Sequence, residues 1–321
     1  GRMNDHLTKG NIDSQDVKIL VIDEFDKCLE MGFREEMSKV VGQLYNLERR
    51  ILLSATDAED IPRFVRLEKI IRLDFLNDEQ QVPDRITLFS VKSPDTAKLD
   101  TLYSLLCSFQ GQSSIVFLNF RDGVERTTAY LVKHGFFTSA FHGGLEQPER
   151  ESALYKFSNG SANIFVSTDL ASRGLDIPDI DNIVHYHLPL NEDGYIHRVG
   201  RTARWDASGR TFFILSQDET IPEYIKGETQ EYILPTERLH PAQPRMATIY
   251  IGKGKNDKIS KMDIVGFLCK KGGLNKDEIG RIDVKDRYAY AAIARKKLNQ
   301  VLKLVHGEKI KGIRTIIENV K

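Results

Sequence analysis

The 321-residue sequence has no long apolar run and few cysteines, and these absences exclude several classes of protein. No stretch approaches the roughly 18 consecutive apolar residues of a membrane-spanning helix, and the N-terminus lacks the layout of a signal peptide. The three cysteines, Cys28, Cys107 and Cys269, lie far apart and lack the spacing of metal ligands. They favour a protein of the reducing cytoplasm over one held by disulfides or zinc.

The formal net charge of the chain is zero, but only because the opposite charges of two parts of the chain cancel. Lys+Arg and Asp+Glu number 46 each. Residues 246–321 hold 18 of the basic and 8 of the acidic residues, so this tail carries a net +10 and the rest of the chain a net −10. A basic module behind an acidic body is typical of contact with a polyanion. A solvated lysine-rich surface has the same charge, so charge alone leaves nucleic-acid binding open.

Short apolar runs alternate with amphipathic stretches through the first two-thirds of the chain. This pattern predicts an α/β fold with parallel sheets covered by helices on both faces. The expected helices include residues 34–47, 97–107, 123–134 and 149–157. The expected strands read VKILVID, RRILLSAT, KIIRLDF, SSIVFLNF, TSAFHGG, NIFVSTD, NIVHYHLP and TFFILS. Ligands of such folds lie at the carboxyl ends of the strands, which here are polar and read IDEFD, SAT, STDLASRG and HYHLP.

Two breaks divide the sequence. Residues 76–85, LNDEQQVPDR, read as a linker between two sheet domains, and residues 218–245 carry four prolines. The tail beyond them has a βαββαβ order, which is the layout of an RRM, a four-stranded RNA-binding domain. Its expected elements are strand 248–251, helix 261–271, strands 279–284 and 288–294, helix 296–306 and strand 312–320.

Charged motifs follow the expected strands. A strand that ends in Asp23 can hold Mg²⁺ beside nucleotide phosphates, and the adjacent Glu24 can orient and deprotonate an attacking water. The tetrapeptide DEFD alone is a weak signal, because an acidic chain contains such a sequence by chance. It is followed by SAT (Ser54–Thr56), STDLASRGLD (167–176) and YIHRVGRTAR (195–204), the last with three arginines at spacings of three.

In this order the motifs resemble those of the DEAD-box RNA helicases. VIDEFD resembles the VLDEAD box of that family, with Phe25 in place of the usual alanine as a packing variant, and SAT matches outright. The motifs of the second RecA-like domain are similar to IVFLNFRD, HGGLEQPER, STDLASRGLDIP and HRVGRTAR. The resemblance implies two RecA-like parallel-sheet domains, an incomplete one (1–76) and a complete one (77–218). A linker (219–245) and a small α+β RRM-like domain (246–321) follow.

The resemblance also implies ATP and Mg²⁺ as cofactors and assigns a role to each motif residue. Asp23 is implied to hold the metal and Glu24 to act as the base. Asp26 is implied to tie the box to Ser54, Thr56 and His197. Arg201 and Arg204 resemble arginine fingers that reach the γ-phosphate, a task that suits a planar, permanently charged guanidinium. Asp176 is implied to accept a hydrogen bond from the ribose, and closure of the two domains to assemble the site.

RNA is the partner that the resemblance implies. The helicase motifs that grip the RNA backbone through phosphates and 2′-hydroxyls contain Gly143, Arg150, Thr168 and Arg173. The tail resembles the RNA-binding domain of DbpA-type DEAD-box proteins, which implies a hairpin of large-subunit ribosomal RNA. Tyr250, Tyr288 and Tyr290 stand at or near its expected aromatic positions, where base stacking and core packing both remain open. Of the three, Tyr288 is counted among the expected RNA-binding residues. The basic candidates for phosphate contact are Lys253, Lys255, Lys258, Arg281, Lys285 and Arg287.

The sequence lacks the Gln motif and the Gly-rich loop that bind ATP in this family. GKGK (252–255) has the wrong spacing for such a loop. Because Gly1–Arg2 resembles the second half of a TPGR motif, we expect the chain to start within the first RecA-like domain. Strands 17–23 and 50–56 are then expected to lack their usual partners.

The expected function is therefore that of a monomeric, cytoplasmic ATP-dependent RNA helicase that remodels ribosomal RNA during large-subunit assembly. We expect these 321 residues alone to bind RNA but to lack ATPase activity. The alternative is a non-enzymatic RNA-binding remnant of a helicase. The presence of Glu24, Arg201 and Arg204 favours the enzyme.

Overall fold

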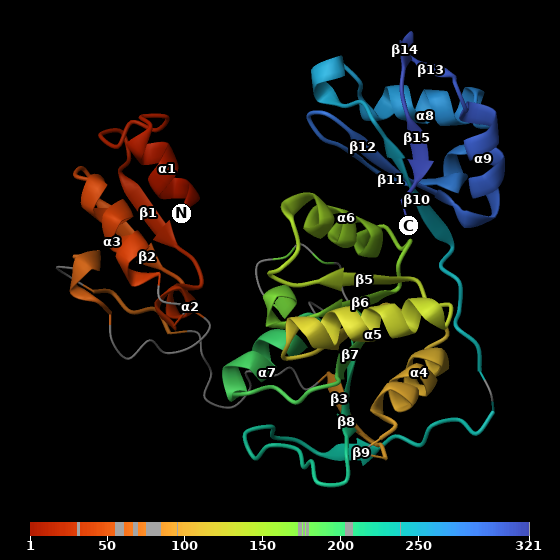
Figure 1. The fold of residues 1–321 in the computed structure, drawn as a ribbon. Coiled ribbons are helices and arrows are strands. Elements are labelled where there is room, and N and C mark those ends of the chain that lie inside the picture. The colour runs from red at the N-terminus through yellow and green to blue at the C-terminus, as the bar shows by residue number, and fades with distance from the viewer. Residues whose placement is uncertain are drawn as a thin grey trace. The chain divides into compact units, whose positions relative to one another are not determined.

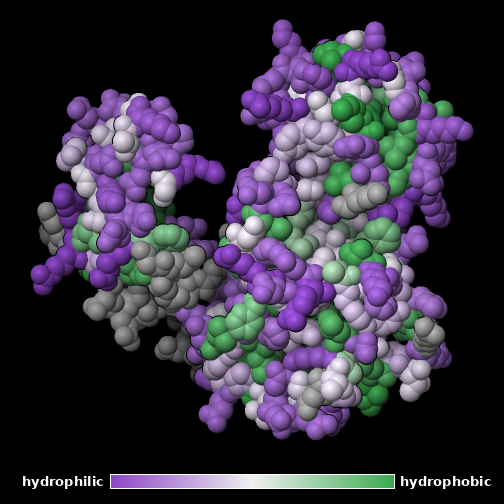
Figure 2. All heavy atoms as spheres, in the orientation of Figure 1, coloured by the Kyte–Doolittle hydropathy of each residue, from purple (hydrophilic) through white to green (hydrophobic). Residues whose placement is uncertain are grey.

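The computed structural model describes residues 1–320 apart from 31–32, 55–60, 67–69, 75–84, 95, 173–174, 176, 178–179, 203–207 and 238. The chain separates into two compact units, residues 1–81 and residues 82–321 (Figure 1). The face visible in Figure 2 is mostly hydrophilic, with scattered apolar residues. Among the described residues no helix is long and apolar enough to cross a membrane.

The first unit holds a parallel pair of strands, β1 (Ile19–Ile22) and β2 (Arg49–Leu52), in a register that places Ile22 opposite Leu52. Within the described residues this sheet has two strands. One row of its apolar side chains is therefore about half-exposed, namely Ile19, Val21, Ile51 and Leu53. The helical elements of the unit are α1 (Arg2–Thr8), α2 (Phe25–Glu30), α3 (Arg34–Gln43) and the 3-10 turn η1 (Arg63–Val65).

The strand predicted for KIIRLDF is wrong over residues 70–74, which the structure describes as irregular chain. Ile70, Ile71 and Leu73 are 63%, 86% and 74% exposed. A strand needs a neighbour to satisfy its backbone N–H and C=O groups, and the two-stranded sheet of the described residues pairs with no part of 70–74. The strand was predicted from apolar composition alone, and composition does not supply the neighbouring strand that pairing requires.

The second unit is built on a parallel sheet, whose strands in the described residues run in the order β5–β6–β4–β7–β8–β3–β9. The strands are β3 (Ile86–Lys92), β4 (Ser114–Phe117), β5 (Thr138–Phe141), β6 (Ile164–Ser167), β7 (Asn182–His185), β8 (Gly209–Leu215) and β9 (Thr229–Glu231). The central strands β4, β6 and β7 are buried at every residue, which explains their non-alternating apolar sequences. Strands β3 and β9 lie outside the predicted set.

Helices cover both faces of this sheet, as predicted. They are α4 (Lys98–Ser108), α5 (Arg121–Lys133), α6 (Gln147–Ser158) and α7 (Glu192–Val199), with the 3-10 turn η2 (Asp169–Ser172) after β6. Val116, Val166 and Val184 pack with α4 and α5 through Leu102, Leu105 and Leu131. The alternate residues Ile115, Phe165 and Ile183 pack in a second core with Ala153 and Phe157 of α6. The predicted RecA-like α/β fold is confirmed.

Residues 246–320 form a four-stranded antiparallel sheet in the order β11–β12–β10–β15, with a separate core of their own residues from Ile249 to Ile310. The strands are β10 (Met246–Ile251), β11 (Ile279–Val284), β12 (Ala289–Ala294), β13 (Lys309–Ile310), β14 (Ile313–Arg314) and β15 (Ile317–Asn319). The helical elements are α8 (Lys261–Lys270), α9 (Leu298–Val305) and the 3-10 turns η3 (Lys255–Asp257), η4 (Lys276–Glu278) and η5 (Arg295–Lys297). The predicted RRM-like order is confirmed.

Candidate functional site

The acidic box lies at the carboxyl end of β1, in a turn with an uncommon backbone. Glu24 adopts φ 48°, a left-handed conformation that costs a non-glycine residue roughly 1–2 kcal/mol. Its N–H donates to Asp23 Oδ1 at 3.0 Å. Phe25 is 1% exposed, and its N–H donates to the Leu53 carbonyl at 3.0 Å. The turn is thus fixed against the end of β2, which places the exposed Ser54 next to the box; Thr56 lies outside the described residues.

The donor set at this turn fits Mg²⁺ bound together with phosphates. Among the described residues no group of three or more His, Cys, Asp or Glu side chains is placed to hold a metal by itself. Magnesium, however, typically binds one or two carboxylates and completes its shell with phosphates and water. The pKa of the Cys28 thiol is raised by burial, and further by the carboxylates of Glu24, Asp26 and Asp23. The three carboxylates, the smaller cause of that shift, give the turn the negative field that a cation site needs.

In the second unit several predicted residues lie at the carboxyl edge of the parallel sheet. Gly143 follows β5 and Thr168 follows β6, and the Thr168 N–H donates to the Phe141 carbonyl at 3.4 Å. A Cβ at Gly143 would lie 3.2 Å from Nη2 of Arg121, so the glycine allows this guanidinium to approach the backbone. Arg121 opens α5 directly after β4, and the sequence reasoning missed it. Arg173 and Asp176 lie outside the described residues.

Arg150 and His197 lie on helices, and Arg201 lies just after one. The helix that carries Arg150, α6, begins with a capping box in which the Glu146 N–H donates to Glu149 Oε2 at 2.8 Å. Helix α7 carries His197, and Arg201 follows it. Arg201 is 8% exposed and donates from Nη1 to the Leu175 carbonyl at 2.8 Å. Arg204 lies outside the described residues.

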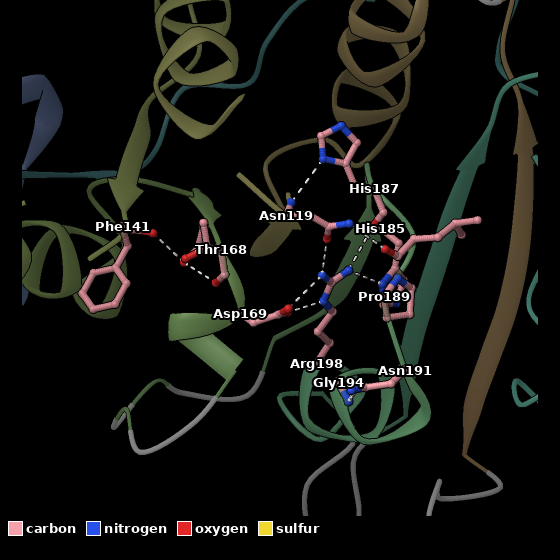
Figure 3. A network of polar contacts seen from close by, with 12 residues as sticks. Asn119, Phe141, Thr168, Asp169, His185, His187, Pro189, Asn191, Gly194 and Arg198 are labelled. Carbon is pink, nitrogen blue, oxygen red and sulfur yellow. Dashed lines mark hydrogen bonds and ion pairs between the residues drawn. The ribbon is translucent and has the colours of Figure 1, made fainter. Parts of the chain in front are cut away.

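Arg198 binds the motif segments of this unit to one another (Figure 3). It is fully buried and pairs with Asp169 of η2, through Nε with Oδ1 and through Nη2 with Oδ2 at 3.2 Å. Nη2 also donates to Asn119 Oδ1 and Nη1 to the His187 carbonyl, both at 2.8 Å. One guanidinium therefore joins α7 to the ends of β4, β6 and β7. The sequence showed three regularly spaced arginines, but it did not indicate that the first is a buried positioning residue.

Models of three protein families match successive parts of the chain. A DEAD/DEAH box helicase model matches residues 1–64, a helicase conserved C-terminal domain matches 97–206, and a DbpA RNA binding domain matches 248–319. ATP-dependent RNA helicase DbpA of Escherichia coli (strain K12) is 30% identical over 321 residues, which cover 97% of this chain and 70% of that protein. The chain belongs to the DbpA-type DEAD-box RNA helicases. Members of this family are ATP-hydrolysing enzymes.

Another relative and two solved structures support this family assignment. The DbpA helicase of Bacillus subtilis (strain 168) is 28% identical and matches 97% of this chain over 71% of its own length. The solved structure of S. cerevisiae Dbp5 bound to RNA and ADP BeF3 has a TM-score of 0.62 at 25% identity, over 71% of this chain and 63% of that one. The helicase Mss116 bound to ssRNA and UDP-BeF matches in fold, with a TM-score of 0.61 at 23% identity, over 74% of this chain and 53% of that one.

The DbpA-type RNA-binding domain brings most of the predicted basic residues together in two loops. We call these the basic loops: residues 253–258, which follow β10, and residues 285–288, between β11 and β12. The Lys255 N–H donates to the Lys285 carbonyl and the Asn256 N–H to the Asp286 carbonyl, both at 2.8 Å. A Cβ at Gly254 would lie 2.2 Å from the Lys285 oxygen, so only glycine permits this contact. Lys253, Lys255, Lys258, Lys285 and Arg287 therefore gather at one end of the domain, whereas the exposed Arg281 lies on β11.

We predict that Arg198→Lys destabilises the helicase C-terminal domain by roughly 2–4 kcal/mol. Lysine keeps the charge but cannot reproduce the fork that bonds Asp169, Asn119 and the His187 carbonyl, which leaves partly buried acceptors without donors. Urea denaturation measures the change. The matched control is Arg126→Lys, an exposed residue of α5, which we expect to change stability by less than about 0.5 kcal/mol. Equal stability of the two variants would show that the Arg198 network contributes nothing.

A second prediction concerns His185, which is fully buried between Phe117 and Phe213. Burial, and then the charge of Arg198, lower the pKa of His185 well below its usual 6.5. The unfolded chain therefore binds a proton below about pH 6.5 that the folded chain does not, so this contribution to stability is complete above pH 6.5 and is lost as the pH falls, by at most about 1.4 kcal/mol per pH unit.

Denaturation between pH 7.5 and pH 5 tests this effect. In His185→Phe the slope of the unfolding free energy against pH should decrease by up to about 1.4 kcal/mol per pH unit, the contribution of one proton. This holds whatever the stability of the variant at neutral pH. In His306→Gln, which changes an exposed histidine, the slope should stay close to that of the parent. An unchanged slope in His185→Phe contradicts a neutral buried His185.

Proposed function

We propose that this chain belongs to an ATP-dependent RNA helicase that locally opens structured RNA, with ribosomal RNA of the large subunit as its substrate. The observation that carries the proposal is the 30% identity to a DbpA helicase over nearly the whole chain, with a DbpA RNA-binding domain behind the helicase motifs. The name of a further relative, ATP-dependent rRNA helicase RRP3 of Coccidioides immitis, supports a ribosomal substrate; it is 33% identical over 88% of this chain and 63% of its own length.

In this proposal the nucleotide is handled by residues of both units. Asp23 would hold Mg²⁺, which would supply charge neutralisation at the phosphates, and Glu24 would take the proton of the attacking water. Asp26, which is 7% exposed, fixes the box with Ser54, Thr56 and His197. Arg201 and Arg204 stabilise the charge that develops on the transferred phosphoryl group, and Asp176 binds the ribose. Since the acids and the arginines belong to different units, hydrolysis depends on closure between them.

The RNA contacts fall into two groups. Gly143, Arg150, Thr168 and Arg173 hold the backbone of the strand that is opened, through contacts without sequence preference. The cations Lys253, Lys255, Arg281, Lys285 and Arg287 attach the enzyme to its substrate by phosphate contacts. We also propose that the protein is a cytoplasmic monomer. Its domain limits, 1–76, 77–218, 219–245 and 246–321, remain part of this proposal.

An experiment that adds a phosphate-binding loop to the chain distinguishes the enzyme hypothesis from the hypothesis of a non-enzymatic remnant. We predict that the 321 residues alone hydrolyse no ATP above background, because their sequence has no Gly-rich loop of the required spacing. A chimera that places the N-terminal portion of the E. coli DbpA helicase before Gly1 should hydrolyse ATP in an RNA-dependent manner. A remnant would stay inactive in the chimera.

The same chimera tests the proposed role of Glu24 as the general base. Glu24→Gln should lower kcat by a hundredfold or more while RNA binding stays unchanged, because general-base catalysis typically contributes 10²–10⁴-fold. Glu48→Gln is the matched control, since Glu48 lies in the same unit in an exposed ion pair with Lys18. RNA-stimulated hydrolysis by the 321 residues alone, or full activity of Glu24→Gln, contradicts the assignments made here.

A further inference from the structure

One aromatic ring is uncovered at the carboxyl edge of the parallel sheet. Phe120 lies just after β4 and is 68% exposed. Among the described residues of the second unit, no other phenylalanine or tyrosine is classed as exposed. Single apolar residues are common on protein surfaces, so the exposure of Phe120 becomes informative only through the residues around it.

The segment that carries Phe120 is held in place by its neighbour Asn119 (Figure 3). The Asn119 N–H donates to His187 Nδ1, and its Nδ2 donates to the Leu188 carbonyl, both at 3.1 Å. Its Oδ1 accepts from Nη2 of the buried Arg198 at 2.8 Å. The exposed ring therefore stands on a fixed segment, and a ligand that binds it has little ordering cost to offset.

The imidazole of His187 supports the ring from one side. The ring centroids of Phe120 and His187 are 6.1 Å apart and the ring planes meet at 67°, an edge-to-face arrangement. Burial, and then the charge of Lys98, lower the pKa of His187, so Nδ1 stays available as the acceptor for Asn119. The larger part of the Phe120 ring still faces solvent.

The ring lies among residues proposed to hold the RNA backbone. Strands β5, β6 and β4 are neighbours in the parallel sheet, so their carboxyl ends meet at one edge. Gly143 follows β5, Thr168 follows β6 and Phe120 follows β4. The next residue, Arg121, is exposed and brings its guanidinium within 3.2 Å of the place where a Cβ at Gly143 would lie. Aromatic rings beside cations are typical of sites for single-stranded nucleic acid.

We propose that Phe120 is a stacking platform for one unpaired base of the RNA strand held at this edge. The inference rests on the proposed RNA-binding function and deepens it. Contacts to phosphates and 2′-hydroxyls hold a strand but leave its bases free to pair again. A phenyl ring that takes the place of a neighbouring base stabilises the unpaired strand and tolerates any sequence, because every base has a π face. The adjacent Arg121 favours an anionic ligand over an apolar protein surface.

A tryptophan at this position gives a local readout in the complete 321-residue chain. The variant is Phe120→Trp with Trp205→Phe, which moves the single tryptophan of the sequence to the proposed platform. The probes are an adenylate strand of about ten nucleotides and an abasic strand of the same length, which keeps the sugar–phosphate backbone. Fluorescence anisotropy of labelled strands measures binding, and tryptophan fluorescence reports stacking.

We expect the adenylate strand to quench the tryptophan on binding and the abasic strand to leave its emission nearly unchanged. The matched control is Val132→Trp with Trp205→Phe, since Val132 is an exposed residue of α5 near the opposite end of that helix. Neither strand should quench this control.

Removal of the ring tests its contribution to affinity. Both chains of this comparison carry Lys255→Ala and Arg287→Ala, which weaken binding at the basic loops. Phe120→Ala should then weaken binding of the adenylate strand by about fivefold or more and of the abasic strand by less than about twofold, because stacking needs a base. Phe120→Leu should behave like Phe120→Ala, and Val132→Ala should change neither affinity.

Two results would overturn the proposal. Binding of the adenylate strand without quenching means that no base reaches the ring. Equal losses of affinity for the two strands in Phe120→Ala mean that the ring contacts the backbone or another part of the protein. Both results leave the proposed RNA binding intact, whereas a chain that binds neither strand refutes the RNA binding and this inference with it.

Discussion

The helicase C-terminal domain depends on one buried charge. Arg198 is withdrawn from water completely, and such a guanidinium is tolerable only if all of its donors are used. Its partners come from three strand ends, so the chain can satisfy Arg198 in only one arrangement of β4, β6, β7 and α7. Two of the residues proposed to touch RNA or nucleotide lie beside these partners, since Thr168 follows β6 and Arg201 follows α7. The buried arginine therefore fixes the segments that carry Thr168 and Arg201.

Much of this fold could be predicted because its sequence patterns have a direct physical cause. Strands β4, β6 and β7 are apolar throughout because helices cover both sides of them, and their polar carboxyl ends are where a parallel sheet exposes groups to a ligand. The strands of the antiparallel C-terminal domain could be predicted equally well, and β11 lies at the expected residues, Ile279–Val284. Phe25 was expected to be a packing variant, and it is buried.

The elements and residues that the sequence did not predict depend on neighbouring segments, and a single stretch of sequence does not reveal its neighbours. Strand β9 is the short polar segment TQE, and it is a strand only because it pairs with the edge of β3. Residues 70–74 of the more apolar KIIRLDF have no such edge among the described strands and are irregular. Arg121 and Arg198 carried no local signal, because Arg121 becomes significant only through the close approach of Gly143, and Arg198 only through burial. Pairing and burial, not composition, decided each case.

The aromatic cluster Tyr250, Tyr288 and Tyr290 of the RNA-binding domain shows why motif chemistry can identify a surface but not its occupant. Tyr290 stacks on Tyr155 of α6, with ring centroids 5.0 Å apart. A ring that stacks on a base and a ring that stacks on Tyr155 use the same offset π contact, so the residues that favour one favour the other. What separates them is the surrounding polar pattern. A reader of bases leaves donors and acceptors open to a ligand, whereas here Tyr288, Thr248 and Arg295 are bonded to Glu151, Ser161 and the Ser161 carbonyl. In this structure the polar groups around the rings are therefore used within the chain, and the sequence motif alone could not reveal that.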